Sequence, residues 1–184
     1  MKALLIVDMQ NGSFPAERPV FNKEEVIMKI NQLSQSFRDT RNKVIFIRHD
    51  GTKQSQYIPE SHDWQIISSL KMEKGDIVLS KTVNDAFYHS ELKSFLDSNE
   101  IDTLVITGYA SDFCVDTTIR SALNKDYKVI VARDAHTTFG RSFISAETII
   151  RHHNIVWENL APAMHKIEVK TSDQIMGEIT TDSL

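Results

Sequence analysis

Short, unbroken apolar runs rich in Val, Ile and Leu constrain the fold of this chain more than any other feature of its sequence. A strand with one solvated face alternates apolar and polar residues, whereas a strand covered on both faces is apolar throughout. The runs therefore predict a mostly parallel sheet with helices on both faces. They are Ala3–Val7, Val44–Ile47, Ile77–Leu79, Thr103–Thr107, Val129–Ala132 and a weaker candidate at Ile155–Trp157.

Segments of helical length separate these runs, and each repeats apolar residues at helical spacing. They are Glu24–Arg38, Ser90–Asn99, Cys114–Lys125 and Ser142–His152. Strand–helix alternation with right-handed crossovers predicts a doubly wound α/β fold. Because the chain has no repeat, no low-complexity tract and no long linker, residues 1–184 are expected to form a single domain. The tail from Thr171 is expected to hold a short helix and a frayed end.

The net charge of the chain and the length of its apolar runs argue against several classes of protein. Lys and Arg total 21 while Asp and Glu total 25, so the formal net charge is −4. This mild acidity, together with the lack of a basic stripe, argues against a nucleic-acid partner. The five apolar residues before Asp8 are too few for a signal peptide, and no run has the length of a membrane span. We therefore expect a cytoplasmic protein with no membrane partner.

Reactive side chains follow the apolar runs, at the edge where parallel sheets bind ligands. They are Asp8, His49 and Asp50, Lys81, Cys114 after a short loop, and Asp134 and His136. Taken singly, each has a structural explanation: Asp8 as a turn or cap residue, Lys81 as a solvated cation, Cys114 as a small buried side chain. Taken together, Asp8, Lys81 and Cys114 supply a proton acceptor, a cation and a nucleophile. We expect these three to meet in one pocket.

The single cysteine, Cys114, excludes an intramolecular disulfide. The pattern places it at the start of a helix, where free N–H groups favour an anion. The helix start and Lys81 both favour the thiolate, while Asp8 opposes it. We expect faster alkylation than for a free thiol with a pKa of about 8.5.

Three collinear motifs match a known family. They are Ile6-Val7-Asp8-Met9-Gln10-Asn11, then Lys81 followed by Ala86-Phe87, and Gly108-Tyr109-Ala110-Ser111-Asp112-Phe113-Cys114-Val115; Thr117–Ala122 and Asp134-Ala135 extend the match. Over about residues 1 to 160, the chain resembles the isochorismatase-like cysteine hydrolases, a nicotinamidase-related family with a three-layer α/β/α fold. Each motif is only moderately specific, but their combination in this order is strong.

The resemblance implies an amidohydrolase with a catalytic triad of Asp8, Lys81 and Cys114. Cys114 would attack a small carboxamide and form a thioester acyl-enzyme, Asp8 would transfer the proton, and Lys81 would hold both charges. The oxyanion hole would consist of the N–H groups of Ala110 and Cys114, beside a cis peptide bond between Tyr109 and Ala110. The family also implies a homodimer or higher homo-oligomer.

The chain departs from nicotinamidases after the second apolar run. Those enzymes carry an Asp-x-His pair that helps to hold a metal, whereas this chain reads Arg48-His49-Asp50-Gly51. His49, Asp50 and His62 have suitable ligand atoms, but no close pair at helical spacing supports a site. We expect no metal and no cofactor, and nicotinamide is a less suitable substrate without the metal.

Aromatic residues near the motifs are candidates for the wall of a substrate pocket. Phe14, Tyr109 and Phe113 lie closest to motif residues, and we predict that they bind the substrate. Trp64 and Phe87 also lie near predicted strand ends or in loops adjoining the triad, and for any one aromatic residue taken singly ordinary core packing is the favoured explanation.

Three other functions agree less well with the residues of this chain. Acid-catalysed hydrolysis of the vinyl ether of isochorismate needs no thiol, so Cys114 argues against it. A binding protein on the same fold would not need all three triad residues. A dinucleotide-binding domain is disfavoured because Asp8-Met9-Gln10-Asn11-Gly12 lacks the G-x-G-x-x-G pattern. The sequence leaves the small-molecule substrate itself undetermined.

Overall fold

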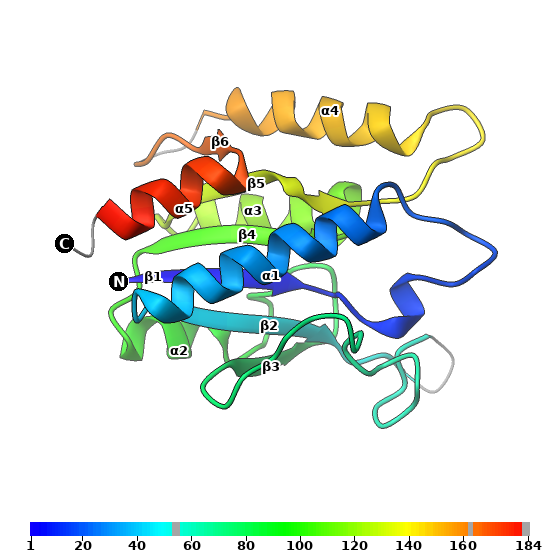
Figure 1. Cartoon of the computed structure of the whole chain (residues 1–184), viewed down its shortest axis with the longest axis horizontal. Coiled ribbons are helices and arrows are strands. Elements are labelled where there is room, and N and C mark those ends of the chain that lie inside the picture. The colour runs from blue at the N-terminus through cyan, green and yellow to red at the C-terminus, as the bar shows by residue number, and fades with distance from the viewer. Residues whose placement is uncertain (53–55, 162–163, 182–184) are drawn as a thin grey trace.

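The computed structural model describes residues 1–52, 56–161 and 164–181, and its strands form one parallel sheet. The strand order is β3-β2-β1-β4-β5-β6, and the strand arrows end on the same side of the molecule (Figure 1). The strands are β1 (Lys2–Val7), β2 (Lys43–His49), β3 (Ile77–Lys81), β4 (Thr103–Tyr109), β5 (Lys128–Thr137) and β6 (Glu168–Lys170). The chain fills one half of the sheet from β1 outward and then returns to β4, so the order reverses between β1 and β4.

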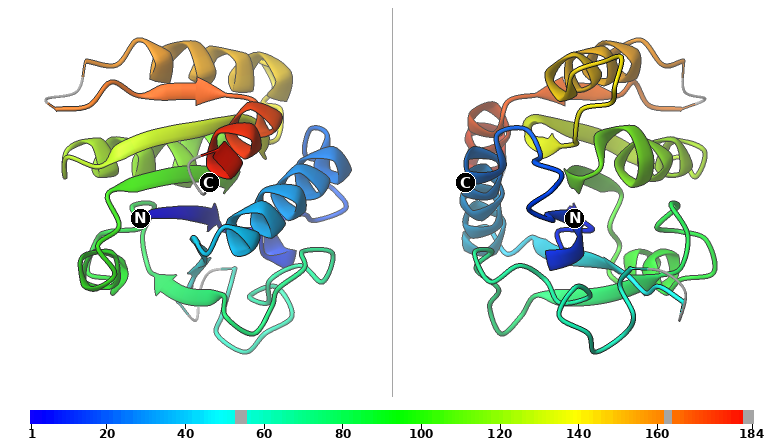
Figure 2. Two further views of the ribbon diagram at one scale, coloured as in Figure 1. Left: turned by 60° about the vertical axis from the view of Figure 1, so that its left-hand side comes forward. Right: turned by 90° about the vertical axis from the view of Figure 1, so that its right-hand side faces the viewer.

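Helices cover both faces of the sheet, which confirms the doubly wound three-layer fold (Figure 2). α1 (Lys23–Asp39) and α5 (Ser172–Thr181) lie on one face, while α2 (Leu92–Ser98), α3 (Asp116–Leu123) and α4 (Ala146–Glu158) lie on the other. A 3-10 turn, η1 (Asn11–Ser13), follows β1, and a π-helical turn, η2 (Ser111–Val115), joins β4 to α3.

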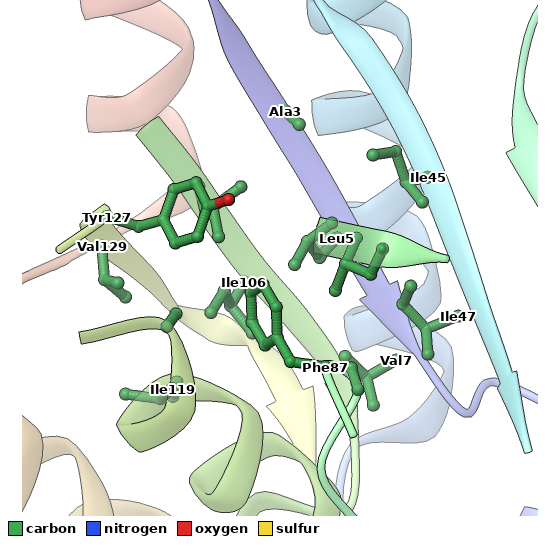
Figure 3. Packing of buried hydrophobic residues seen from close by; sticks show 14 of the residues in the cluster. Ala3, Leu5, Val7, Ile45, Ile47, Phe87, Ile106, Ile119, Tyr127 and Val129 are labelled. Carbon is green, nitrogen blue, oxygen red and sulfur yellow. The ribbon is translucent and has the colours of Figure 1, made fainter. Parts of the chain in front are cut away.

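The unbroken apolar strands fill two cores, one on each side of the sheet. In β1, Ala3, Leu5 and Val7 pack toward α2, α3 and α4, whereas Leu4 and Ile6 pack toward α1 and α5. Figure 3 shows the first core, where Leu5 and Val7 lie near side chains of β2 and β4. Burial on both sides is the physical reason why β1 has no polar position between Lys2 and Asp8.

The weaker strand candidate, Ile155–Trp157, is wrong, because these residues lie in the last turns of α4. A short apolar triplet does not distinguish a strand from a helix. Here Trp157 continues the buried helical face that Ile150 and Asn154 begin, while Ile155 is 60% exposed.

The start of α4 differs from the expected one because a capping side chain fixes where the helix begins. The helix expected at Ser142–His152 begins at Ala146, because the Ser145 side chain accepts a hydrogen bond from the Thr148 N–H and caps it. Phe143, expected on its apolar face, lies before the helix and is exposed. β6 was not predicted, whereas the helix expected in the tail is α5.

None of the helices within residues 1–52, 56–161 and 164–181 has the length and apolar character needed to cross a bilayer.

Candidate active site

Asp8, Lys81 and Cys114 meet at the carboxyl edge of the sheet. Asp8 follows β1, Lys81 is the last residue of β3, and Cys114 lies in η2 after β4. The Lys81 Nζ lies 2.8 Å from Asp8 Oδ2 and 3.3 Å from Cys114 Sγ. The structure thus brings together the three residues that the sequence analysis selected, next to the point where the strand order reverses.

Asp8 is buried at the base of this cluster. Its backbone has a left-handed φ of 48°, and its N–H donates to the Ile47 carbonyl at 2.9 Å, which turns the chain sharply at the end of β1. Oδ2 pairs with Lys81, whereas the buried Oδ1 has no hydrogen-bond partner among the described residues. An unpartnered carboxylate oxygen next to a thiol is suited to accept a proton.

Lys81 also binds a residue whose role the sequence left open. Its Nζ lies 3.2 Å from His49 Nδ1 and donates to the Val83 carbonyl at 3.0 Å. Burial lowers the pKa of Lys81, but its attraction to Asp8 and Cys114 outweighs burial, so the pKa is raised and the ammonium persists.

His49 is held neutral, because burial and the Lys81 charge lower its pKa. Its Nδ1 therefore accepts from Lys81, and the proton is on Nε2. The register of the sheet explains this placement, because it pairs His49 of β2 with Lys81 of β3.

The expectation of a resting thiolate at Cys114 is wrong for the free pocket. Burial and the Asp8 carboxylate raise the pKa of Cys114 to about 12, against the opposing effect of Lys81. The sequence correctly identified the competing charges, but it could not supply the depth of burial, which favours the neutral thiol. The resting cluster is therefore a carboxylate, an ammonium and a thiol.

A pocket of about 350 Å³ opens over this cluster. Tyr109 and Phe113, two of the three predicted pocket residues, line it. Phe14 is not among the residues that line it; its ring packs against that of Tyr109, with 5.7 Å between the ring centres, and lines a neighbouring hollow. The lining residues are Asp8, Arg18, His49, Gln56, Tyr57, Asn84, Tyr109, Ala110, Phe113, Cys114 and Phe139.

The loop that carries Ala110 and Cys114 has the backbone expected from the resemblance, since the Tyr109–Ala110 peptide bond is cis. Ala110 lines the pocket beside Cys114, and its carbonyl accepts hydrogen bonds from the N–H groups of Phe113 and Val115. Just before it, Gly108 has a φ of +115°, and a Cβ there would lie 2.2 Å from the Val7 carbonyl oxygen. Only glycine allows β4 to approach β1 so closely.

The other metal candidates do not join His49. Asp50 Oδ1 accepts from the Trp64 indole at 2.7 Å and lies 3.8 Å from Arg48, while His62 is exposed beside Asp63. No group of three or more potential metal-ligating side chains occurs within the described ranges. Asp134 accepts hydrogen bonds from the N–H and hydroxyl of Ser172 and so caps α5.

Arg18, Tyr57, Asn84 and Phe139 are pocket residues that the sequence analysis missed. These residues lie in loops, where no regular spacing of apolar residues indicates which way a side chain points. Only their proximity to strand ends could have indicated them.

Comparison with known proteins agrees with this architecture. The chain is 33% identical over 188 residues to YrdC of Bacillus subtilis (strain 168), an uncharacterized isochorismatase family protein, with 100% of this chain and 94% of YrdC covered. It is 34% identical over 87 residues to the ureidoacrylate amidohydrolase RutB of Variovorax paradoxus (strain S110), covering 47% of this chain and 34% of RutB. A crystal structure of an isochorismatase family protein matches with a TM-score of 0.85 and 28% identity, covering 92% of this chain and 98% of the other. Residues 2–164 match the model of the isochorismatase domain, and the chain therefore belongs to the isochorismatase family of hydrolases.

Proposed function

We propose that this protein is a cysteine amidohydrolase that cleaves the C–N bond of a small carboxamide through a thioester on Cys114. The observation that carries the proposal is the position of the Lys81 Nζ, 2.8 Å from the Asp8 carboxylate and 3.3 Å from the Cys114 sulfur, beneath an open pocket. The similarity to a protein named amidohydrolase supports the same reaction class.

Acylation begins when the substrate carbonyl lies over Cys114. The thiol proton moves to the carboxylate of Asp8, whose Oδ1 lacks a partner, and the sulfur attacks the carbonyl carbon. Lys81 stabilises the sulfur as negative charge develops on it. The C–S bond forms, and the carbonyl oxygen becomes an oxyanion.

The oxyanion is then held by the N–H groups of Ala110, which directly precedes η2, and of Cys114, which lies within η2. Preorganised donors of this kind contribute a large part of barrier lowering in acyl transfer. When the intermediate collapses, Asp8 returns its proton to the nitrogen, the C–N bond breaks, and the amine leaves.

Deacylation uses the same groups in reverse. Asp8 accepts a proton from water, the hydroxide attacks the thioester, and the C–S bond breaks. The thiolate then takes the proton back from Asp8, which restores the neutral thiol that burial favours. A carboxylic acid is released.

The experiment is a screen of small amides for ammonia release. We expect Cys114→Ala to lower turnover by at least about 10³-fold, because the nucleophile is removed. Rapid acid quenching and intact-protein mass measurement should detect an acyl adduct on the wild type only. Arg41→Gln, an exposed substitution at the opposite edge of the sheet, is the matched control. Equal ammonia release by wild type and Cys114→Ala would contradict covalent catalysis.

A further inference from the structure

The pocket wall contains a cation, Arg18, whose charge no carboxylate in the described part of the chain compensates. Arg18 lines the pocket, and its guanidinium lies 4.1 Å from the centre of the Phe139 ring. Among the residues that the structure describes, no carboxylate lies within ion-pair distance of Arg18, and its buried Nε has no hydrogen-bond partner. A buried donor without a partner costs free energy unless a ligand or water satisfies it.

The second guanidinium at this wall is neutralised. Arg141 stacks on the same Phe139 ring at 3.6 Å and pairs with Asp112 at 2.5 Å. Asp112 thus compensates Arg141 and leaves Arg18 unpaired. Phe139 contacts both guanidinium groups, and of the two only that of Arg141 is paired with a carboxylate among the described residues.

The remaining ionisable groups of the pocket add no net charge. Asp8 is balanced by Lys81. Burial lowers the pKa of His49 and raises the pKa of Tyr57, Tyr109 and Cys114, so all four are neutral at pH 7. The described part of the pocket therefore carries a net charge of about +1, located on Arg18.

We propose that Arg18 is a substrate-binding residue that selects small amides bearing a carboxylate group away from the scissile bond. This inference rests on the proposed amidohydrolase function and adds the class of substrate to it. A guanidinium presents two parallel N–H donors that match the two oxygens of a carboxylate. Tyr109 also lines the pocket, and burial raises the pKa of its hydroxyl to about 12, which keeps the hydroxyl protonated as a hydrogen-bond donor.

The size of the pocket is consistent with this class. About 350 Å³ holds a small ligand rather than a peptide. With the carbonyl over Cys114, the carboxylate must reach Arg18 from the same small molecule. The test therefore varies the distance between the scissile amide and the carboxylate of the probe.

The test uses matched probes of increasing chain length: malonamate, succinamate and glutaramate, each with its neutral diamide. Binding is measured by calorimetry to Cys114→Ala, and ammonia release is measured with wild type. We expect at least one monoamide to bind about tenfold or more tightly than its diamide, as loss of a charge-assisted hydrogen bond implies. Arg18→Gln should abolish this preference, and Arg18→Lys should restore part of it. Arg41→Gln should leave the preference unchanged.

The outcomes separate the two proposals. A carboxylate preference that depends on Arg18 supports this inference even if no amide releases ammonia, in which case the amidohydrolase proposal fails. Ammonia release from the diamides, without a carboxylate preference at any chain length, supports the amidohydrolase and overturns the role of Arg18. A preference that survives Arg18→Gln, or the absence of measurable binding of every probe, also overturns it.

Discussion

At the scale of single residues, the protonation of the Cys114 thiol is the feature of the pocket that matters most for its reactivity. Burial and the Asp8 charge raise the pKa of Cys114 and so favour the neutral thiol. The Lys81 ammonium contacts both other residues: its Nζ lies 2.8 Å from Asp8 Oδ2, whose charge it balances, and 3.3 Å from Cys114 Sγ.

The first prediction concerns the reactivity of Cys114. Because burial and the Asp8 carboxylate raise the pKa of Cys114, a smaller fraction of this thiol is ionised at pH 7 than of a free thiol, so its alkylation should be slower. Asp8→Asn removes the opposing negative charge and should speed alkylation. Lys81→Met leaves that charge uncompensated and should slow it further. The measurement is the iodoacetamide rate against pH.

Labelling reports on one site, because Cys114 is the only cysteine of the chain. Cys114→Ala is the blank. Fast labelling of the wild type at pH 7, or a profile that Lys81→Met does not change, would show that the charges do not act on the sulfur as described.

At the scale of elements, a buried hydrogen-bond chain holds η2 against β5 and α4. The Ser111 hydroxyl lies 2.8 Å from His136 Nδ1, and His136 Nε2 lies 3.1 Å from Asn154 Oδ1. Burial lowers the pKa of His136 to about 4, so the imidazole is neutral, accepts from Ser111 and donates to Asn154. The turn that carries Cys114 is thereby tied to two other elements.

The second prediction follows from this histidine. Its pKa is about 6.5 in the unfolded chain and about 4 when folded, so the unfolded state binds the proton first as pH falls. The associated stability is complete above pH 6.5 and is lost between pH 6.5 and 4, by up to about 3 kcal/mol. Urea unfolding at pH 7 and pH 4.5 should show a larger loss for wild type than for His136→Gln.

An equal loss in the two proteins would indicate that His136 does not carry the effect. Proton NMR provides a second readout, since the His136 ring should remain neutral at pH 5, where an exposed histidine is largely protonated.

The third prediction concerns the contact between β1 and β4. Gly108→Ala places a Cβ 2.2 Å from the Val7 carbonyl oxygen at a φ of +115°, so the strands must separate just below Asp8 and Cys114. We expect a loss of more than about 2 kcal/mol in the free energy of unfolding. Gly177→Ala in α5 is the matched control; its Cβ meets nothing within 4 Å, and it should stabilise the protein by about 0.5–1 kcal/mol. Comparable stabilities of the two variants would refute the steric argument.

Across the whole molecule, the site and the cores occupy different parts of the sheet. The cores fill the middle of both faces, whereas the pocket lies beyond the carboxyl ends of the strands. Loops can therefore build the site without carrying most of the stability.

The fourth prediction tests this separation. Leu96 of α2 is fully buried near the amino end of β4, opposite to the pocket, and its carbonyl accepts from the Ile101 N–H. Leu96→Ala should lower the free energy of unfolding by about 2–5 kcal/mol, because it leaves a cavity. The alkylation profile of Cys114 should stay within about twofold of wild type. Lys93→Ala, on the exposed side of the same helix, should cost less than about 1 kcal/mol. A large change in Cys114 reactivity in Leu96→Ala would show that core and site are coupled.

The sequence by itself determined the layers and the edge that bears the chemistry. Continuous apolar runs of four residues or more are typical of strands covered on both faces. The residues that follow such strands lie at one edge of a parallel sheet, which brings Asp8, Lys81 and Cys114 together. The motifs, in turn, were sufficient to identify the family.

The tertiary structure alone decided the details on which reactivity and selectivity depend. Ile155–Trp157 became helical because Trp157 completes a buried face of α4, a long-range contact that a local pattern does not contain. His49 lies next to Lys81 because the register of β2 and β3 pairs the two residues. Phe14 packs against Tyr109 while Arg18 lines the pocket, because packing, and not a sequence period, orients side chains in loops. The thiol of Cys114 stayed protonated because its pKa depends on burial and on the distance to Asp8, and both exist only once the chain has folded.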